Sequence, residues 1–281
     1  ISKGGDSLDV FHQSAVLDSR IETALKADAK DPWALLWHGQ LEIDRGRIAT
    51  DIAAVREAHA LQPTRVPAGV VSTALLFALQ RDFDQASPLW REAVALSGSP
   101  GTAMVVLRAA VDGFLRTGDL PQAWEAMQQL LAQADAVAAG PQLENGEAAE
   151  PQSAADGMVV DGVNARLSVA PARWIQGRLT ELFAKADPAL RATLDAFAER
   201  ETAAVRADSV PTADRIPRLR HCIERFGMHR CGLEARRHLA EALTEAIEAG
   251  ASGDEGRNLV VERDFVLLEL ARVGEPADRE Y

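Results

Sequence analysis

The sequence predicts an all-α protein made of paired helices. Of its 281 residues, 47% are hydrophobic but only 5% are aromatic, and alanine is abundant. This balance favours helices packed through small side chains over β-sandwiches. Apolar residues recur at helical spacing, and glycine or proline stands where one helix would end and the next begin. We therefore expect an α-solenoid of helical hairpins, followed by a second helical array or bundle.

Helix signals in the first half come in pairs. Asp6 and Ser7 are candidate N-caps for a helix that runs to about residue 26. Asp31 caps the next helix, with Pro32 in the first turn, where its missing N–H costs nothing. Gly46 is expected to end that helix. Further helices are expected at about 49–60, 70–80, 83–96, 103–116 and 121–136.

The hairpins repeat at a nearly constant interval. Equivalent positions are separated by 34, 35 and 37 residues (51−17, 86−51 and 123−86), counted between Leu17, Asp51, Ala86 and Ala123. A helix pair about every 34 residues is the period of tetratricopeptide repeats. Residues 1–138 resemble that family at the consensus small, glycine, bulky, alanine and proline positions. The matching residues are Gly39, Gly46, Val55, Ala58, Pro63, Trp90, Ala93, Phe114, Gly118, Ala123 and Met127.

The sequence departs from the family's pattern at three places. Asp51 stands where alanine is expected, Arg81 where glycine is usual, and Ser97-Gly98 replaces the closing proline. The resemblance implies a concave groove lined by the first helix of each hairpin, which binds an extended or helical polypeptide. The groove residues it implies are Trp33, Leu36, Gln40, Ile43, Asp44, Val71, Leu75, Arg108, Asp112 and Arg116. Alternatively, later helices of this chain or the loop at 139–170 fill the groove.

Composition changes at about residue 139. The stretch 139–170 is rich in glycine, proline and acidic residues, which predicts a linker or extended loop. Two short apolar runs near its end, 158–160 and 166–169, form either a small hairpin or an extended segment. Residues 171–273 form a second helical region, and 274–281 are a polar tail. The helices of the second helical region are expected at about 172–186, 188–205, 216–226, 233–249 and 255–273.

The second half resembles the helical region of bacterial PQQ-binding-like β-propeller repeat proteins. The resemblance covers about residues 166–250, in RWIQGRLTELFAKADPALRATLDA and RLRHCIERFGMHRCGLEARRHLAEAL. It implies an accessory helical domain of a larger PQQ-type propeller protein or enzyme whose catalytic part lies outside this chain. It also favours the periplasm or cell envelope, with the cytoplasm as the alternative.

One cluster combines cysteines with histidines, and it leaves three interpretations open. Its members are His221, Cys222, His229, Cys231 and His238. Thiolate and imidazole are zinc ligands, but the spacing lacks the tight pairs of structural zinc sites. A disulfide across the turn between the two cysteines is conceivable. The simplest interpretation is two small buried apolar side chains.

Composition and motifs argue against several functions. The formal net charge is −12, with no basic cluster for nucleic acid or an anionic membrane. No apolar run reaches the roughly 18 residues of a membrane span. Neither a phosphate-binding glycine loop nor a G-x-S-x-G nucleophile elbow occurs. We therefore expect no catalytic residue, metal or cofactor, and predict a scaffold that binds another polypeptide or another domain of its own protein.

Overall fold

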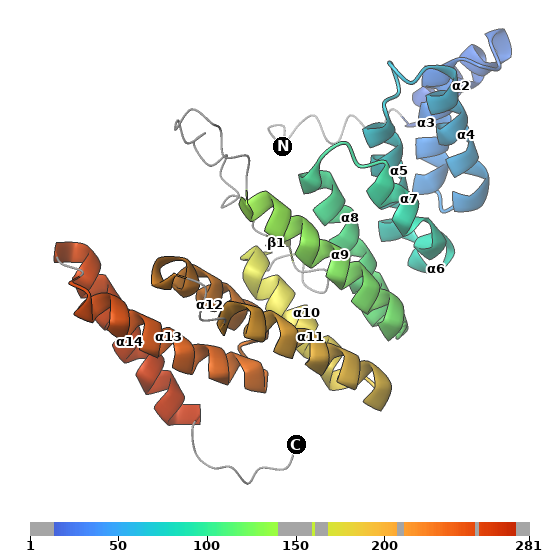
Figure 1. Cartoon of the computed structure of the whole chain (residues 1–281). Helices are drawn as coiled ribbons and strands as arrows, with labels where there is room; N and C mark the ends of the chain where they lie inside the picture. The colour runs from blue at the N-terminus through green and yellow to red at the C-terminus, as the bar shows by residue number, and fades with distance from the viewer. Residues whose placement is uncertain (1–13, 140–158, 161–167, 207–210, 251–252, 274–281) are drawn as a thin grey trace. The chain divides into compact units, whose positions relative to one another are not determined.

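The computed structural model describes residues 14–139, 159–160, 168–206, 211–250 and 253–273, which are almost entirely α-helical (Figure 1). The prediction of an all-α fold is confirmed. The chain divides into two compact units, Ile1–Glu147 and Ala148–Tyr281. Their boundary lies within the stretch 139–170. The expected start of the first helix at residue 7 and the tail 274–281 lie outside the described residues.

Unit 1 contains helices that pack mainly on their neighbours in sequence. Helix α3 packs on α4, and α8 packs on α9. In addition, α5 contacts both α3 and α8, so the first helices of successive hairpins are neighbours. The long helices of this unit are α2 (Ser14–Ala27), α3 (Pro32–Asp44), α4 (Ile48–Leu61), α5 (Ala68–Arg81), α8 (Pro100–Thr117) and α9 (Leu120–Ala139).

The prediction of a single helix at 83–96 is wrong. The structure has a short helix α6 (Phe83–Ala86), a 3₁₀ turn (Ser87–Leu89) and then α7 (Trp90–Ala95). Pro88 lies in the turn and has no N–H to give to the carbonyl four residues earlier. The chain therefore tightens locally before the α-helix resumes.

Aromatic side chains from three elements meet in the core of unit 1. The Phe83 and Phe114 rings meet edge to face with centroids 4.8 Å apart, and Trp90 lies 6.2 Å from Phe114. Gly113 makes room for this cluster, because a Cβ built there would lie 2.1 Å from the Phe83 ring. Gly118 then ends α8 in the left-handed region, at φ +82°.

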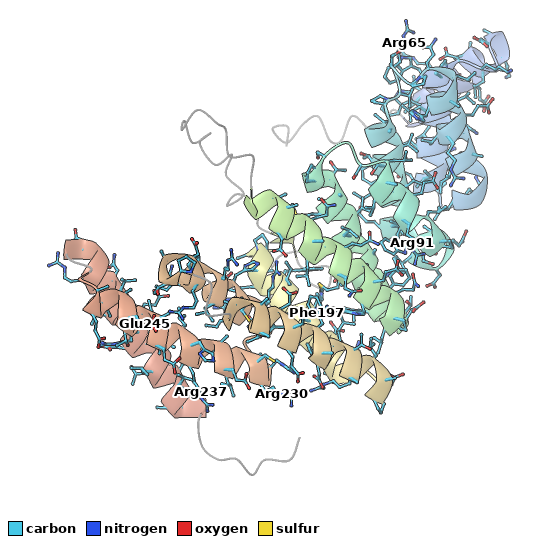
Figure 2. All side chains as sticks on the ribbon, in the orientation of Figure 1. Arg65, Arg91, Phe197, Arg230, Arg237 and Glu245 are labelled. Atoms are coloured by element: carbon cyan, nitrogen blue, oxygen red, sulfur yellow. The ribbon has the colours of Figure 1, made fainter. Side chains whose placement is uncertain are left out.

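Ion pairs between residues about 35 positions apart join α4 to α7 and α7 to α9. Arg56 Nε of α4 donates to Glu92 of α7 at 2.8 Å. Arg91 Nε, labelled in Figure 2, donates to Glu125 of α9 at 2.9 Å. Each hydrogen bond raises the pKa of its arginine. The partners are 36 and 34 residues apart in sequence, so a similar arginine–glutamate contact occurs twice at nearly the same spacing.

Unit 2 is a second group of packed helices. Its elements are α10 (Pro171–Lys185), α11 (Pro188–Arg206), α12 (Thr212–Phe226), α13 (Arg230–Glu248) and α14 (Gly253–Val273). Helix α13 packs on α12 and on α14. The core contains leucines that are fully or almost fully buried, Leu179, Leu182, Leu194, Leu219 and Leu243.

Two helices of unit 2 begin earlier than predicted, and the first of them, α12, begins at Thr212 rather than at residue 216. Helix α13 begins at Arg230 rather than at Leu233, because His229 Nδ1 accepts from the backbone N–H of Cys231 at 3.2 Å and caps the helix. Before α10, Val159–Val160 (β1) pairs antiparallel with Ser168–Val169 (β2). Of the two alternatives left open for the apolar runs at 158–160 and 166–169, their described residues therefore pair as in the small hairpin.

Candidate binding face

The first helices of unit 1 expose large apolar side chains. Trp33 and Trp37 of α3 are 45% and 47% exposed. Phe77 of α5 is 44% exposed, and Val105 of α8 is 41% exposed. We call these four residues the first-helix face. Each is half covered by its surroundings, so each holds a defined position while offering apolar surface to solvent.

The packing of α5 explains why only one side of this helix is exposed. Helices α3 and α8 both contact α5, and α4 and α7 also pack against it. These contacts bury most of α5 and leave Thr73, Phe77 and Gln80 exposed, at the i, i+4, i+7 spacing of one helix face. This stripe is the side of α5 that no neighbouring helix covers. Helices α3 and α8 flank α5, and each exposes apolar side chains of its own, Trp33 and Trp37 on α3 and Val105 on α8.

Local sequence signals fix the position of the two tryptophans. The Asp31 carboxylate accepts from the backbone N–H of Trp33 at 2.8 Å and of Ala34 at 3.2 Å. This cap starts α3 so that Trp33 lies in its first turn. Trp37 follows four residues later on the same face. The cap thereby aligns two indole rings along one edge of the face.

The prediction is wrong for four groove residues, which are buried and do not lie at the surface. Leu36 is 8% exposed, Ile43 is fully buried, and Val71 and Leu75 are each 1% exposed. All four belong to the core and offer almost no surface to a partner. The prediction assigned the wrong side of α3 and of α5 to the surface, because both helices carry apolar residues on nearly every side.

The other predicted residues lie at or near the surface. Trp33, Asp44 and Arg116 are exposed, and Gln40, Arg108 and Asp112 are half-buried. Arg108 Nε donates to the Met104 carbonyl at 3.2 Å. Burial lowers the Arg108 pKa, against the opposing attraction of Asp112. The prediction missed Trp37, Phe77 and Val105. The four-residue interval from Trp33 to Trp37 was the signal that could have found the first of these.

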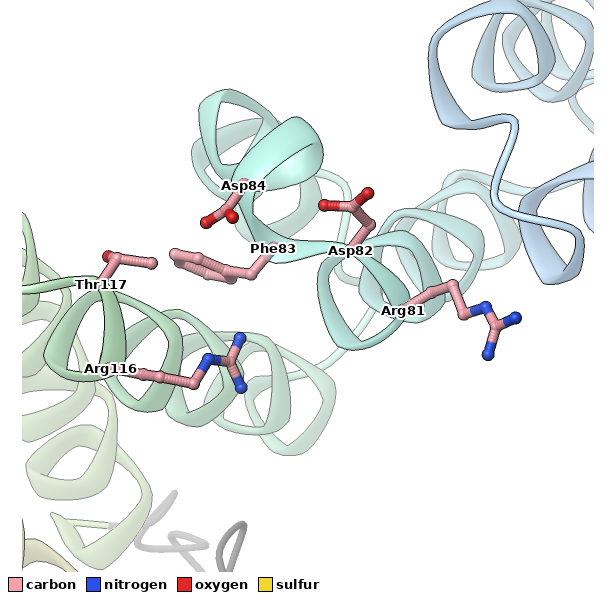
Figure 3. Close-up of a pocket in the computed structure, with 6 residues that line it drawn as sticks. All are labelled: Arg81, Asp82, Phe83, Asp84, Arg116 and Thr117. Atoms are coloured by element: carbon pink, nitrogen blue, oxygen red, sulfur yellow. The ribbon is translucent and has the colours of Figure 1, made fainter.

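A charged hollow lies where α5 and α8 end (Figure 3). It is open, has a volume of about 590 Å³, and is lined by Arg81, Asp82, Phe83, Asp84, Arg116 and Thr117. Arg116 reaches toward the Phe83 ring, 5.9 Å from its centroid, whereas Arg81 points away from it. Asp82 is occupied as the N-cap of α6, where it accepts from the N–H of Gln85. The hollow can accept a polar or charged group beside Arg116.

The cysteines and histidines of unit 2 do not come together as a metal site. Cys222 and Cys231 are free and buried, and burial raises the pKa of both thiols. The Cys222 sulfur lies 3.3 Å from the Thr202 hydroxyl. His229 Nε2 lies 3.0 Å from Asp195, so both of its ring nitrogens have partners. In the part of the chain that the structure describes, no group of three or more His, Cys, Asp or Glu residues is placed to hold a metal ion.

Comparisons with known proteins identify no relative of this chain. No family model, curated protein or solved structure matches this chain. Among the described helices, none is both long and apolar enough to cross a membrane. The structure alone thus defines the class, an all-α protein of packed helices with an aromatic face on its first unit.

Proposed function

We propose that this chain is a non-catalytic scaffold of tetratricopeptide-like hairpins that binds a polypeptide segment on the first-helix face. The observation that carries the proposal is the presence of four large apolar side chains, each 41–47% exposed, on three neighbouring helices. Exposed apolar surface gathered in one place is characteristic of interaction sites. Extended surfaces of this kind are the usual working parts of helical arrays.

The dimensions of the face suit a short segment. Packed helices lie about 8–10 Å apart, so the distance from α3 across α5 to α8 is roughly 20 Å. An extended chain covers that distance with about six residues. The segment belongs to another protein or to another domain of the same protein, and it presents apolar side chains to the two tryptophans, Phe77 and Val105.

Charged groups at the ends of the first helices add direction to the face. Asp44 ends α3, and Arg116 lies in the last turn of α8 beside the charged hollow. An acidic side chain following the apolar part of the segment would find Arg116 within this hollow. The partner that fits best is therefore an apolar segment with an acidic group at one end.

The test begins with selection of short peptides from a random display library on the immobilised full chain. Calorimetric titration of the selected peptide then compares wild type with the double substitution Trp33→Ala and Trp37→Ala. Removing two aromatic anchors should weaken binding at least about 30-fold, because such residues commonly dominate interfaces. Both side chains are half exposed, so the helical circular dichroism should not change.

Phe265→Ala provides the matched control, since it removes an exposed aromatic side chain from a helix of unit 2. This variant should bind the selected peptide like wild type. Unchanged affinity in the tryptophan double variant, or failure of the library to yield any peptide that binds, would contradict the proposal.

A further inference from the structure

Helix α14 carries the most exposed group of apolar side chains on any one described helix. Val261, Phe265 and Leu268 are 68%, 61% and 64% exposed. They follow the i, i+4, i+7 spacing that places residues on one helix face. On another side of the same helix, Val266 is only 7% exposed, and α14 packs along α13 (Figure 1). Helix α14 is thus apolar on two sides, and α13 covers one of them.

Charged residues mark both ends of the exposed stripe. Asp254 lies two helical turns before Val261, its side chain is 90% exposed, and it forms an ion pair with Arg257, three residues further along the helix. Arg272 lies two turns after Phe265 and is also exposed. Seven residues separate the members of each of these pairs, so all four residues lie along the same side of the helix. The N-terminal end of the stripe therefore carries the Asp254–Arg257 ion pair, and its C-terminal end carries Arg272.

This pattern is symmetric about the level of residue 263. Asp254 and Arg272 are each nine residues from that level, and Val261 and Phe265 are each two residues from it. If a second identical helix lay antiparallel, with a two-fold axis at residue 263, each Asp254 would oppose an Arg272 and each Val261 would oppose a Phe265. A parallel pair would instead oppose like charges at both ends.

We propose that α14 is a dimerisation helix, which pairs antiparallel with α14 of a second copy of this chain. The interface is isologous, as in most two-fold dimers, because the same stripe serves both copies. Antiparallel pairing also sets opposite helix dipole ends side by side. One helix pair is a small interface, so the dimer forms in roughly the micromolar range. The proposal concerns unit 2 and does not depend on the peptide-binding face of unit 1.

Sedimentation equilibrium of the full chain at about 5–300 µM tests the pairing. As the wild-type concentration rises, its average mass should increase from that of one chain, 30.2 kDa, to twice that value. Phe265→Asp should raise the dimer dissociation constant at least about 30-fold. Phe77→Asp is the matched control in unit 1. It should leave the dimer intact, although it should impair peptide binding. Wild type that stays monomeric up to about 300 µM, or Phe265→Asp with unchanged dimerisation, would overturn the proposal.

A charge exchange tests the antiparallel direction. Arg272→Glu should weaken the dimer by several-fold, because it places two carboxylates together at each end of the interface. Adding Asp254→Arg to that variant should restore the wild-type dissociation constant. Both positions are exposed, so circular dichroism should confirm that every variant folds. If the double variant is no tighter than Arg272→Glu alone, the antiparallel pairing is wrong.

Discussion

The two units expose apolar surface in different ways. In unit 1 the four apolar residues of the first-helix face are spread over three helices, and each is 41–47% exposed. In unit 2 the stripe of α14 lies on one helix, and its residues are 61–68% exposed. Side chains half enclosed by neighbouring helices form a shaped surface that suits a short segment. A protruding row on one helix suits another helix. The arrangement of exposed apolar residues thus indicates the shape of the partner.

The largest expected effect separates neighbouring residues of α3. Leu36→Ala should lower the free energy of unfolding by about 2–4 kcal/mol, because Leu36 is buried and its truncation leaves a cavity. Trp37→Ala, at an exposed position, should change it by less than about 1 kcal/mol. Urea unfolding followed by circular dichroism measures both. Equal losses would mean that Trp37 belongs to the core and not to the face.

A pair of helical glycines compares the packing of the two units. Gly113→Ala should cost about 1–3 kcal/mol, because its Cβ would meet the buried Phe83 ring in unit 1. Gly177→Ala in α10 of unit 2 meets no atom within 4 Å and should stabilise by about 0.5–1 kcal/mol through helix propensity. Thermal unfolding of the two variants should give midpoint shifts of opposite sign. A Gly113→Ala midpoint equal to or above that of wild type would rule out the close contact at Gly113.

The two buried thiols should make the free energy of unfolding depend on pH in the alkaline range. Both cysteines lie there, and burial raises the pKa of each above the usual value. Their contribution is fully present below the unfolded thiol pKa, about 8.5, and is lost as pH rises through the raised folded pKa. The double substitution Cys222→Ala and Cys231→Ala should reduce the slope of unfolding free energy against pH above about 8.5, by at most about 1.4 kcal/mol per pH unit per thiol. Urea titrations at a series of pH values measure it. Identical slopes for the variant and wild type would show that the thiols ionise normally in the fold.

The smallest effect concerns the ion pairs between helices. A double-mutant cycle between Arg56 and Glu92 should give a coupling free energy of about 0.2–1 kcal/mol. The effect is small because the two side chains are 45% and 34% exposed. Arg220 and Glu262, which join α12 to α14 in unit 2, offer the equivalent pair. Both couplings should decrease in about 0.5 M salt. A coupling above about 2 kcal/mol in either unit would mean that the pair organises the helix packing.

The sequence was most informative where a residue type has one strong local preference. Asp31 with Pro32 marked the start of α3, and Gly118 marked the end of α8, because capping and left-handed geometry are short-range effects. The break at Pro88 follows from the same kind of local chemistry, but the continuous apolar pattern concealed it. These features explain why the hairpin order could be predicted.

The orientation of each helix was harder to predict, since it depends on distant neighbours. Helix α5 is apolar on nearly every side, so no polar stripe marks which side faces solvent. The prediction selected Val71 and Leu75, whereas the structure exposes Phe77. On α3, a large residue such as Trp37 would ordinarily be assigned to the core. Only the packing of α3, α5 and α8 shows that the aromatic residues lie outside.

The most direct test of the first-helix face is an NMR titration that follows the five tryptophan indole N–H signals. Trp33 and Trp37 are on the face, whereas Trp90, Trp124 and Trp174 are 1%, 6% and 4% exposed. On addition of the peptide selected by display, the account predicts that the Trp33 and Trp37 signals shift and the other three stay in place. Shifts confined to one or more of the three buried tryptophans would contradict it.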